Sequence, residues 1–135
     1  MPELILASTS PHRRQLLERL AVPFRCEAPG VDEQLVKDAG GSVLAVVTEL
    51  ARKKALAVAE RHPDAIVIGG DQAAVLDGER LDKPHDTARA IAQLERLAGH
   101  AHELITAVAI AHGGELVEFV DATRLVMRPL SRAEI

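Results

Sequence analysis

The sequence is short of aromatic side chains, with two phenylalanines and no tryptophan or tyrosine among its 135 residues. So few rings disfavour a platform on which the bases of single-stranded nucleic acid could stack. Basic residues are not in excess either, because the formal net charge is −4, and a polyanion would gain nothing at long range. Cys26 is the single cysteine, which excludes an internal disulfide and a cysteine-based zinc site. These shortages predict no nucleic-acid partner.

Long apolar runs are missing as well. No stretch approaches the ~20 apolar residues of a membrane span, and the first residues lack the basic and then apolar pattern of a secretory leader. Hydrophobic residues make up 47% of the chain and charged residues 27%, which is the balance of a soluble globular protein. We therefore expect a cytoplasmic protein without a membrane partner, folded as a single domain over residues 1–135.

The N-terminus carries the first candidate site. An apolar segment at 3–7 predicts a strand, and Ser10 and Pro11 are typical of the N-cap and first residue of a helix. Free backbone N–H groups at that helix start would meet the side chain of Arg13 and the hydroxyls of Ser8 and Ser10. Such a place suits a phosphate group. The alternative is an ordinary strand–turn–helix with solvated arginines.

Asp71 is the second candidate. It lies between two apolar segments, 65–68 and 73–76, that predict strand structure, and Gly69 and Gly70 directly precede it. A carboxylate between buried segments is costly unless it binds a metal, finds a partner or does chemistry. The glycines would let the backbone bend and a ligand approach closely. A capping role for Asp71 is the structural alternative.

The rest of the chain alternates helical and strand patterns, which favours an α/β fold. Ser42 and Asp86 are predicted helix caps, and Asp77-Gly78 is a hairpin signal. Ser131 and Glu134 form the capping box that starts a helix. The remaining predicted elements are helices over 11–21, 42–62 and 86–97 and strands over 24–27, 79–84, 102–111 and 116–127.

Helical spacing also predicts which apolar residues face the core. In the three predicted helices these are Leu16, Leu17 and Leu20; then Leu44, Val47, Leu50, Ala51, Ala55 and Val58; and finally Ala90, Ile91, Leu94 and Leu97.

One segment carries a family resemblance. Leu6-Ala7-Ser8-x-Ser10-Pro11-x-Arg13 resembles the N-terminal signature of the Maf family of nucleoside triphosphate pyrophosphatases. Further agreement comes from Val31-Asp32-Glu33, Lys54-Ala55, Asp71-Gln72, Lys83-Pro84 and Thr106-Ala107-Val108-Ala109. Two positions depart from the family pattern: Lys53 replaces a usual acidic residue, and Asp82 replaces a usual Gly or Glu.

The resemblance implies a mixed twisted sheet flanked by helices, with a nucleotide cleft as in Maf and inosine-triphosphatase-like proteins. It implies hydrolysis between the α and β phosphates, which yields a nucleoside monophosphate and pyrophosphate. Asp71 would be catalytic, either as a ligand of a divalent cation (Mg²⁺ or Mn²⁺) or as the group that orients or deprotonates water. Glu33 would be a second metal ligand. The expected phosphate-binding residues are Ser8, Ser10, Arg13, Lys54 and Lys83.

The resemblance is consistent with more than one nucleotide substrate. Asp71-Gln72 resembles the 7-methyl-GTP subgroup, in which Gln72 would recognise the base, because an amide both donates and accepts. Thr106 and its neighbours resemble some pyrimidine-group members, so a dTTP/UTP pyrophosphatase is one alternative. A non-catalytic nucleotide-binding regulator of septum formation is another. The resemblance covers about two thirds of a typical member, so we expect a C-terminally incomplete Maf-like domain, and it makes a homodimer plausible.

Overall fold

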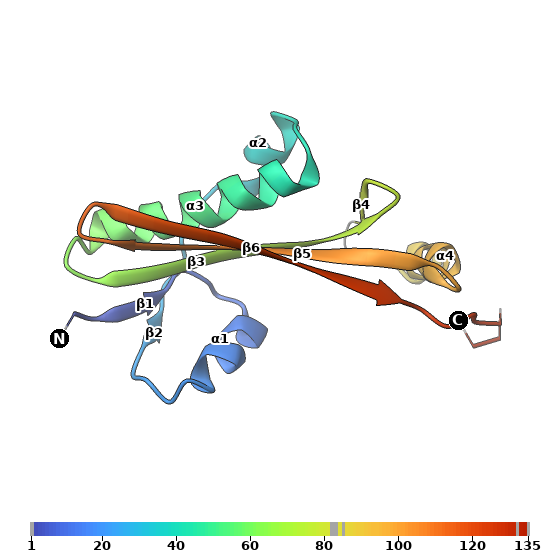
Figure 1. Ribbon diagram of the computed structural model, residues 1–135, viewed down its shortest axis with the longest axis horizontal. Helices are drawn as coiled ribbons and strands as arrows, with labels where there is room; N and C mark the ends of the chain where they lie inside the picture. The colour runs from blue at the N-terminus through green and yellow to red at the C-terminus, as the bar shows by residue number, and fades with distance from the viewer. Residues whose placement is uncertain (1, 82–83, 85, 132, 135) are drawn as a thin grey trace.

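The computed structural model describes residues 2–81, 84, 86–131 and 133–134. Within these residues the chain forms a mixed six-stranded sheet in the order β2-β1-β3-β5-β6, with β4 paired to β3 (Figure 1). The elements are β1 (Leu4–Leu6), α1 (Pro11–Glu18), β2 (Arg25–Cys26), α2 (Glu33–Asp38), α3 (Val43–Arg61), β3 (Ile66–Leu76), β4 (Glu79–Leu81), α4 (Thr87–Leu97), β5 (Ala101–His112) and β6 (Glu115–Val126).

The first part of the sheet is parallel and the second is antiparallel. β1 lies parallel to β2 and to β3, with Leu6 opposite Cys26 and Ile68. Helices form the crossovers that parallel strands require, with α1 between β1 and β2, and α2 and α3 between β2 and β3. β3, β5 and β6 then pair antiparallel. This mixed α/β sheet with flanking helices confirms the predicted fold class.

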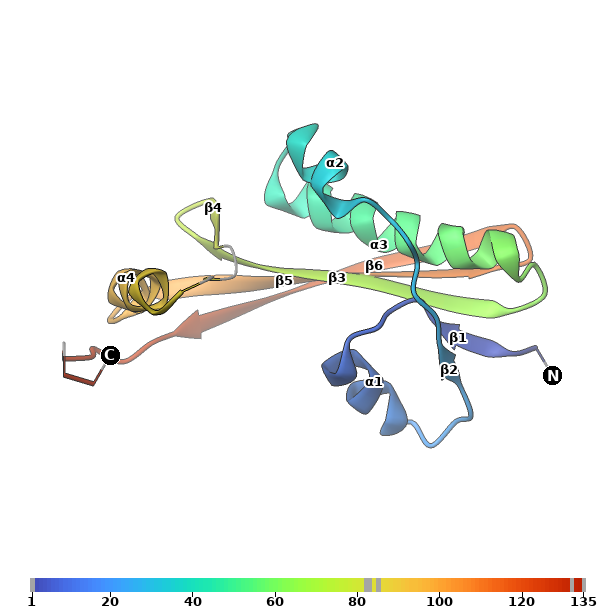
Figure 2. The ribbon, with the colours of Figure 1, turned by 180° about the vertical axis from the view of Figure 1, so that it is seen from behind.

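Tight turns join the antiparallel strands. Asp77 and Gly78 both have positive φ values, 51° and 78°, as expected for the predicted two-residue hairpin between β3 and β4. Gly113 and Gly114 do the same between β5 and β6, with φ values of 58° and 81°. The β5–β6 hairpin is a long twisted ribbon that extends beyond the other strands toward α4 (Figures 1 and 2).

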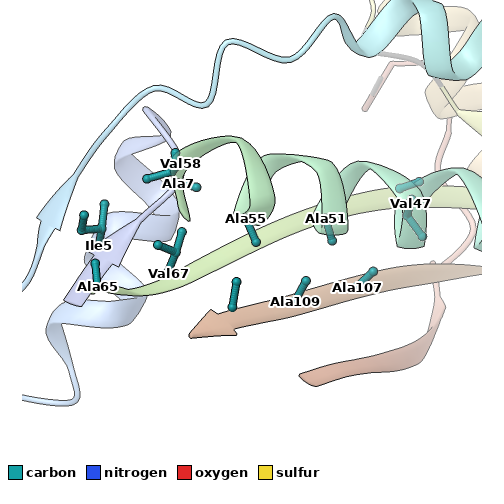
Figure 3. Packing of buried hydrophobic residues seen from close by; sticks show 12 residues of the cluster. Ile5, Ala7, Val47, Ala51, Ala55, Val58, Ala65, Val67, Ala107 and Ala109 are labelled. Atoms are coloured by element: carbon teal, nitrogen blue, oxygen red, sulfur yellow. The ribbon is translucent and has the colours of Figure 1, made fainter. Parts of the chain in front are cut away.

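Small residues form the core between α3 and the sheet. Ala51 and Ala55 of α3 face Ala107 and Ala109 of β5 (Figure 3), and all four are at most 1% exposed. A Cβ added to Gly69 would lie 2.5 Å from the carbonyl oxygen of Ala51 and 2.6 Å from the amide nitrogen of Ala55. Helix and strand therefore approach more closely here than larger side chains would allow.

Several predicted core residues are exposed instead. α1 buries none of its residues, and Leu16 is 46% exposed. Leu44 of α3 is half-exposed, and α4 buries Leu97 while Ile91 is outside the core. The helical spacing therefore assigned to the core several residues that this structure leaves exposed.

Local structure adds one helix and removes one predicted interruption. Glu33 begins the short helix α2, with Asp32 as its N-cap, and this helix was not among the predicted elements. The predicted interruption between the strand segments 65–68 and 73–76 is wrong, because β3 runs unbroken through Gly69 and Gly70. Its pairing with β5, continuous from Val67 to Val75, holds the glycines in the sheet.

The two caps near the chain ends are formed as predicted. Ser10 accepts a hydrogen bond from the amide of Arg13, and Ser131 and Glu134 exchange the two bonds of a capping box. None of the helices among the described residues is long and apolar enough to cross a lipid bilayer.

Candidate active site

A cleft of about 610 Å³ lies beyond the end of β1, where the edge of β3 is left open. Its walls come from the turn after β1, the segment between β2 and α2, the middle of α3 and the middle of β3. The lining residues are Ala7, Ser8, Thr9, Ser10, Arg13, Ala28, Pro29, Gly30, Val31, Glu33, Lys54 and Asp71.

Lys54 connects the two carboxylates of the cleft. Its Nζ lies 2.8 Å from Oε1 of Glu33 and 3.3 Å from Oδ1 of Asp71. It also donates to the carbonyl oxygen of Gly70 at 3.4 Å. Lys54 is 6% exposed and Asp71 is 5% exposed, so each of these buried charges has an opposite charge beside it, as burial requires.

The close α3–β3 contact positions this pair. Lys54 precedes Ala55, and Asp71 lies two residues after Gly69 on the same face of β3. Because α3 rests against the backbone at Gly69, the Lys54 side chain reaches along the strand to Asp71. The sequence thus places the lysine and the aspartate on a helix and a strand that approach each other closely at Gly69.

The N-terminal turn brings the remaining predicted groups. An Arg13 guanidinium nitrogen lies 3.9 Å from Oδ1 of Asp71. Ser8 Oγ accepts from the amide of Ser10 at 3.0 Å, and Ser10 Oγ accepts from the amide of Arg13 at 3.4 Å. Both hydroxyls therefore act as acceptors within the turn and keep their protons for donation to an anion.

The charges lower the pKa of Glu33 below its ordinary value. The largest cause is the hydrogen bond from Lys54, and the positive charges of Lys54, Lys37 and Arg13 act in the same direction, while burial opposes them. Glu33 is therefore a carboxylate at neutral pH, which leaves it able to hold a cation or balance Lys54.

The donor set is compatible with a divalent cation held jointly with a substrate. Asp71 Oδ2 is buried and has no hydrogen-bond partner among the described residues. The described residues contain no group of three or more His, Cys, Asp or Glu side chains that could hold a metal by themselves. Mg²⁺ is usually bound by one or two carboxylates together with substrate phosphates, so this set fits that mode.

The structure thus gathers Ser8, Ser10, Arg13, Glu33, Lys54 and Asp71 in one cleft. Gln72 is not among the lining residues. It points to the opposite face of β3, where its amide donates to the hydroxyl of Thr106 at 3.0 Å. Lys83 lies outside the described residues.

Sequence reasoning did not identify the wall formed by residues 28–31. Pro29-Gly30 indicated a turn, but these side chains carry no chemistry of their own. Gly30, with φ of 69°, adopts the left-handed conformation that this turn needs. The Pro29-Gly30 pair was the one sequence signal that indicated a turn at this wall.

The fold is shared with solved structures. A dITP/XTP pyrophosphatase from Mycobacterium abscessus aligns with a TM-score of 0.57 at 18% identity, over 90% of this chain and 72% of that one. The Ham1 protein of Staphylococcus aureus aligns with a TM-score of 0.60 at 15% identity, over 90% and 70%. At these identities the likeness concerns the fold alone.

The sequence identifies the family. Residues 3–135 match the family of Maf-like proteins, and the chain belongs to that family. A dTTP/UTP pyrophosphatase of Symbiobacterium thermophilum is 44% identical over all of this chain and 69% of its own length. 7-Methyl-GTP pyrophosphatases of Xanthomonas oryzae and Bdellovibrio bacteriovorus are 46% and 41% identical, over 100% and 98% of this chain and 70% and 69% of their own lengths. The predicted family is therefore confirmed.

Proposed function

We propose that this protein is a nucleoside triphosphate pyrophosphatase that releases pyrophosphate and a nucleoside monophosphate. The observation that carries the proposal is the buried Lys54–Asp71 pair, which lies in one cleft with Arg13 and Glu33. The names of the similar proteins from Symbiobacterium, Xanthomonas and Bdellovibrio support the same reaction.

In this proposal the N-terminal turn binds phosphate oxygens. The Ser8 and Ser10 hydroxyls donate to them, and Arg13 and the start of α1 supply positive charge. Lys54 neutralises charge that develops on the phosphates, and Lys83 has the same proposed role. Water forms a bond to the α phosphorus while the bond from that phosphorus to the bridging oxygen breaks, and pyrophosphate leaves.

Asp71 and Glu33 would hold a divalent cation, which stabilises negative charge on the phosphates when bound. Asp71 Oδ2 can alternatively accept a proton from the attacking water, because it is buried and available. Binding of Mn²⁺ in the presence of a nucleotide analogue that cannot be hydrolysed separates the roles. Weaker binding to Asp71→Asn favours the metal-ligand role, whereas unchanged binding with lost turnover favours the base.

For the substrate we propose 7-methyl-GTP. The Asp71-Gln72 pair and the Xanthomonas and Bdellovibrio proteins support this choice. The pyrimidine nucleotides dTTP and UTP are the second candidate, favoured by the Symbiobacterium protein.

The test is pyrophosphate release from 7-methyl-GTP, GTP, dTTP, UTP and CTP with Mg²⁺ or Mn²⁺. We expect turnover of 7-methyl-GTP well above that of GTP. Preference for dTTP and UTP would overturn the substrate assignment alone. Nucleotide binding without release of pyrophosphate would overturn the enzyme assignment and leave a binding protein.

A further inference from the structure

The wall of the cleft formed by residues 28–31 is a segment without strand pairing among the described residues. It follows β2 and runs alongside α3 to reach α2 (Figure 2). Its position decides where Glu33 lies, because Glu33 is the first residue of α2. What holds this segment therefore bears on the geometry of the site.

Arg61, the last residue of α3, contacts the first two residues of this segment and Glu27, which directly precedes it. One guanidinium nitrogen donates to the carbonyl oxygens of Ala28 at 2.9 Å and Pro29 at 3.2 Å. Another lies 3.3 Å from Oε2 of Glu27. The remaining nitrogen, Nε, donates to the carbonyl oxygen of Ala57 in α3 itself. The guanidinium is thus fixed to its own helix and to the wall of the cleft.

Glu27 is itself held by more than Arg61. Arg25 lies 3.0 Å and His62 2.8 Å from its Oε1. The pKa of Glu27 is lowered, first by the hydrogen bond from Arg25 and then by that from His62. The carboxylate that Arg61 contacts is therefore an anchored anion.

The other end of the segment is held from the same helix. Glu33 contacts Lys54, and Arg61 follows Lys54 by about two helical turns, so both lie on one side of α3. One helix thus fixes both ends of the segment, through an ammonium in the cleft and a guanidinium outside it.

We infer that Arg61 is a positioning residue for the proposed reaction: it holds residues 28–31 against α3 and so sets the width of the phosphate-binding cleft. The inference rests on the proposed function. Arginine suits the role because its planar fork of five donors can meet two carbonyls and a carboxylate together, which a lysine ammonium cannot.

The test compares Arg61→Met, which keeps an apolar stem but removes the donors, with Arg61→Lys and with the control Arg52→Met. Arg52 is on the same helix, is about as exposed (45% against 48%) and makes a two-contact ion pair with Glu118 away from the cleft. We expect Arg61→Met to raise KM for the nucleotide about tenfold and Arg61→Lys about threefold, with kcat changed less than about twofold. Arg52→Met should leave KM unchanged.

A second readout does not need turnover. Backbone ¹⁵N order parameters at Gly30 and Val31 should fall from about 0.85 to below about 0.6 in Arg61→Met and stay unchanged in Arg52→Met. Equal order parameters and equal KM in the two variants would overturn the inference. A wild-type protein without turnover, but with the expected loss of order in Arg61→Met, would overturn the proposed function and leave the structural part of the inference standing.

Discussion

The two faces of the sheet differ in a way that residue size alone would not predict. The face covered by α3 carries small residues, including Gly69, Ala107 and Ala109, and these are almost fully buried. The opposite face carries larger ones on the same hairpin, and Val117 and Phe119 are 57% and 52% exposed. Small side chains are buried here because the helix lies almost on the strand backbone.

The difference between the faces shows where the positions of side chains are tightly constrained. The covered face holds Asp71 against Lys54, so an atom added there would displace the groups proposed to act in catalysis. On the opposite face Gln72 is exposed, and its amide donates to the hydroxyl of Thr106. Paired substitutions on the two faces therefore test whether the loss of activity or stability depends on the face of the sheet rather than on the type of residue.

The largest contrast concerns neighbouring residues of β3. Asp71→Asn should lower kcat for pyrophosphate release about 10³-fold, because the amide can neither hold a cation as a carboxylate does nor accept the water proton. Gln72→Ala should change kcat and KM less than about threefold, because Gln72 lies outside the cleft on the opposite face of β3. Comparable losses of kcat in both variants would show that the two faces serve the chemistry equally.

The next contrast concerns stability at two adjacent glycines. Gly69→Ala should lower the free energy of unfolding by about 3 kcal/mol, because the new Cβ would meet α3 backbone atoms at 2.5 and 2.6 Å. Gly70→Ala, whose Cβ would lie 3.5 Å from the carbonyl oxygen of Ala107, should cost less than about 1 kcal/mol. Urea unfolding measures both, and similar midpoints would contradict the close contact.

A third pair removes the same atoms from opposite faces. Val67 is fully buried and Val117 is exposed. Val67→Ala should cost about 2 kcal/mol of unfolding free energy, whereas Val117→Ala should cost less than about 0.5 kcal/mol. Thermal unfolding of the two variants at one protein concentration is sufficient, and a large loss for Val117→Ala would mean that the open face is covered in solution.

The smallest effect concerns pH. The pKa of Glu33 in the folded protein lies below its ordinary value near 4.5, so the ionised carboxylate stabilises the fold at neutral pH. That contribution is lost as the pH falls from about 4.5 through the lowered pKa. The unfolding free energy of Glu33→Gln should therefore decline less between about pH 5 and pH 3 than that of the wild type. Parallel curves would show that Lys54 does not favour the ionised form of Glu33.

The fold class and most of the site were predictable because their signals are local. Ser10 and Pro11 mark a helix start, Asp77-Gly78 marks a hairpin, and Asp71 between apolar segments marks a costly carboxylate. The family resemblance added Glu33 and Lys54, and the structure places both beside Asp71.

Other features depend on tertiary contacts that no local pattern records. The continuity of β3 through Gly69 comes from its pairing with β5. The exposure of Leu16 depends on tertiary packing, because α1 has a helical apolar pattern but no buried residue. The contacts of Arg61 join residues more than thirty positions apart. Their effect on the cleft was therefore visible only in three dimensions.

The neutrality of the cleft has a consequence for how a nucleotide arrives. Arg13 and Lys54 carry two positive charges, Glu33 and Asp71 carry two negative ones, and the chain as a whole is negative. The described part of the cleft therefore offers a free triphosphate no net attraction, so its encounter rate should fall less with added salt than that of a steered ligand. A divalent counterion that offsets part of the triphosphate charge should favour capture.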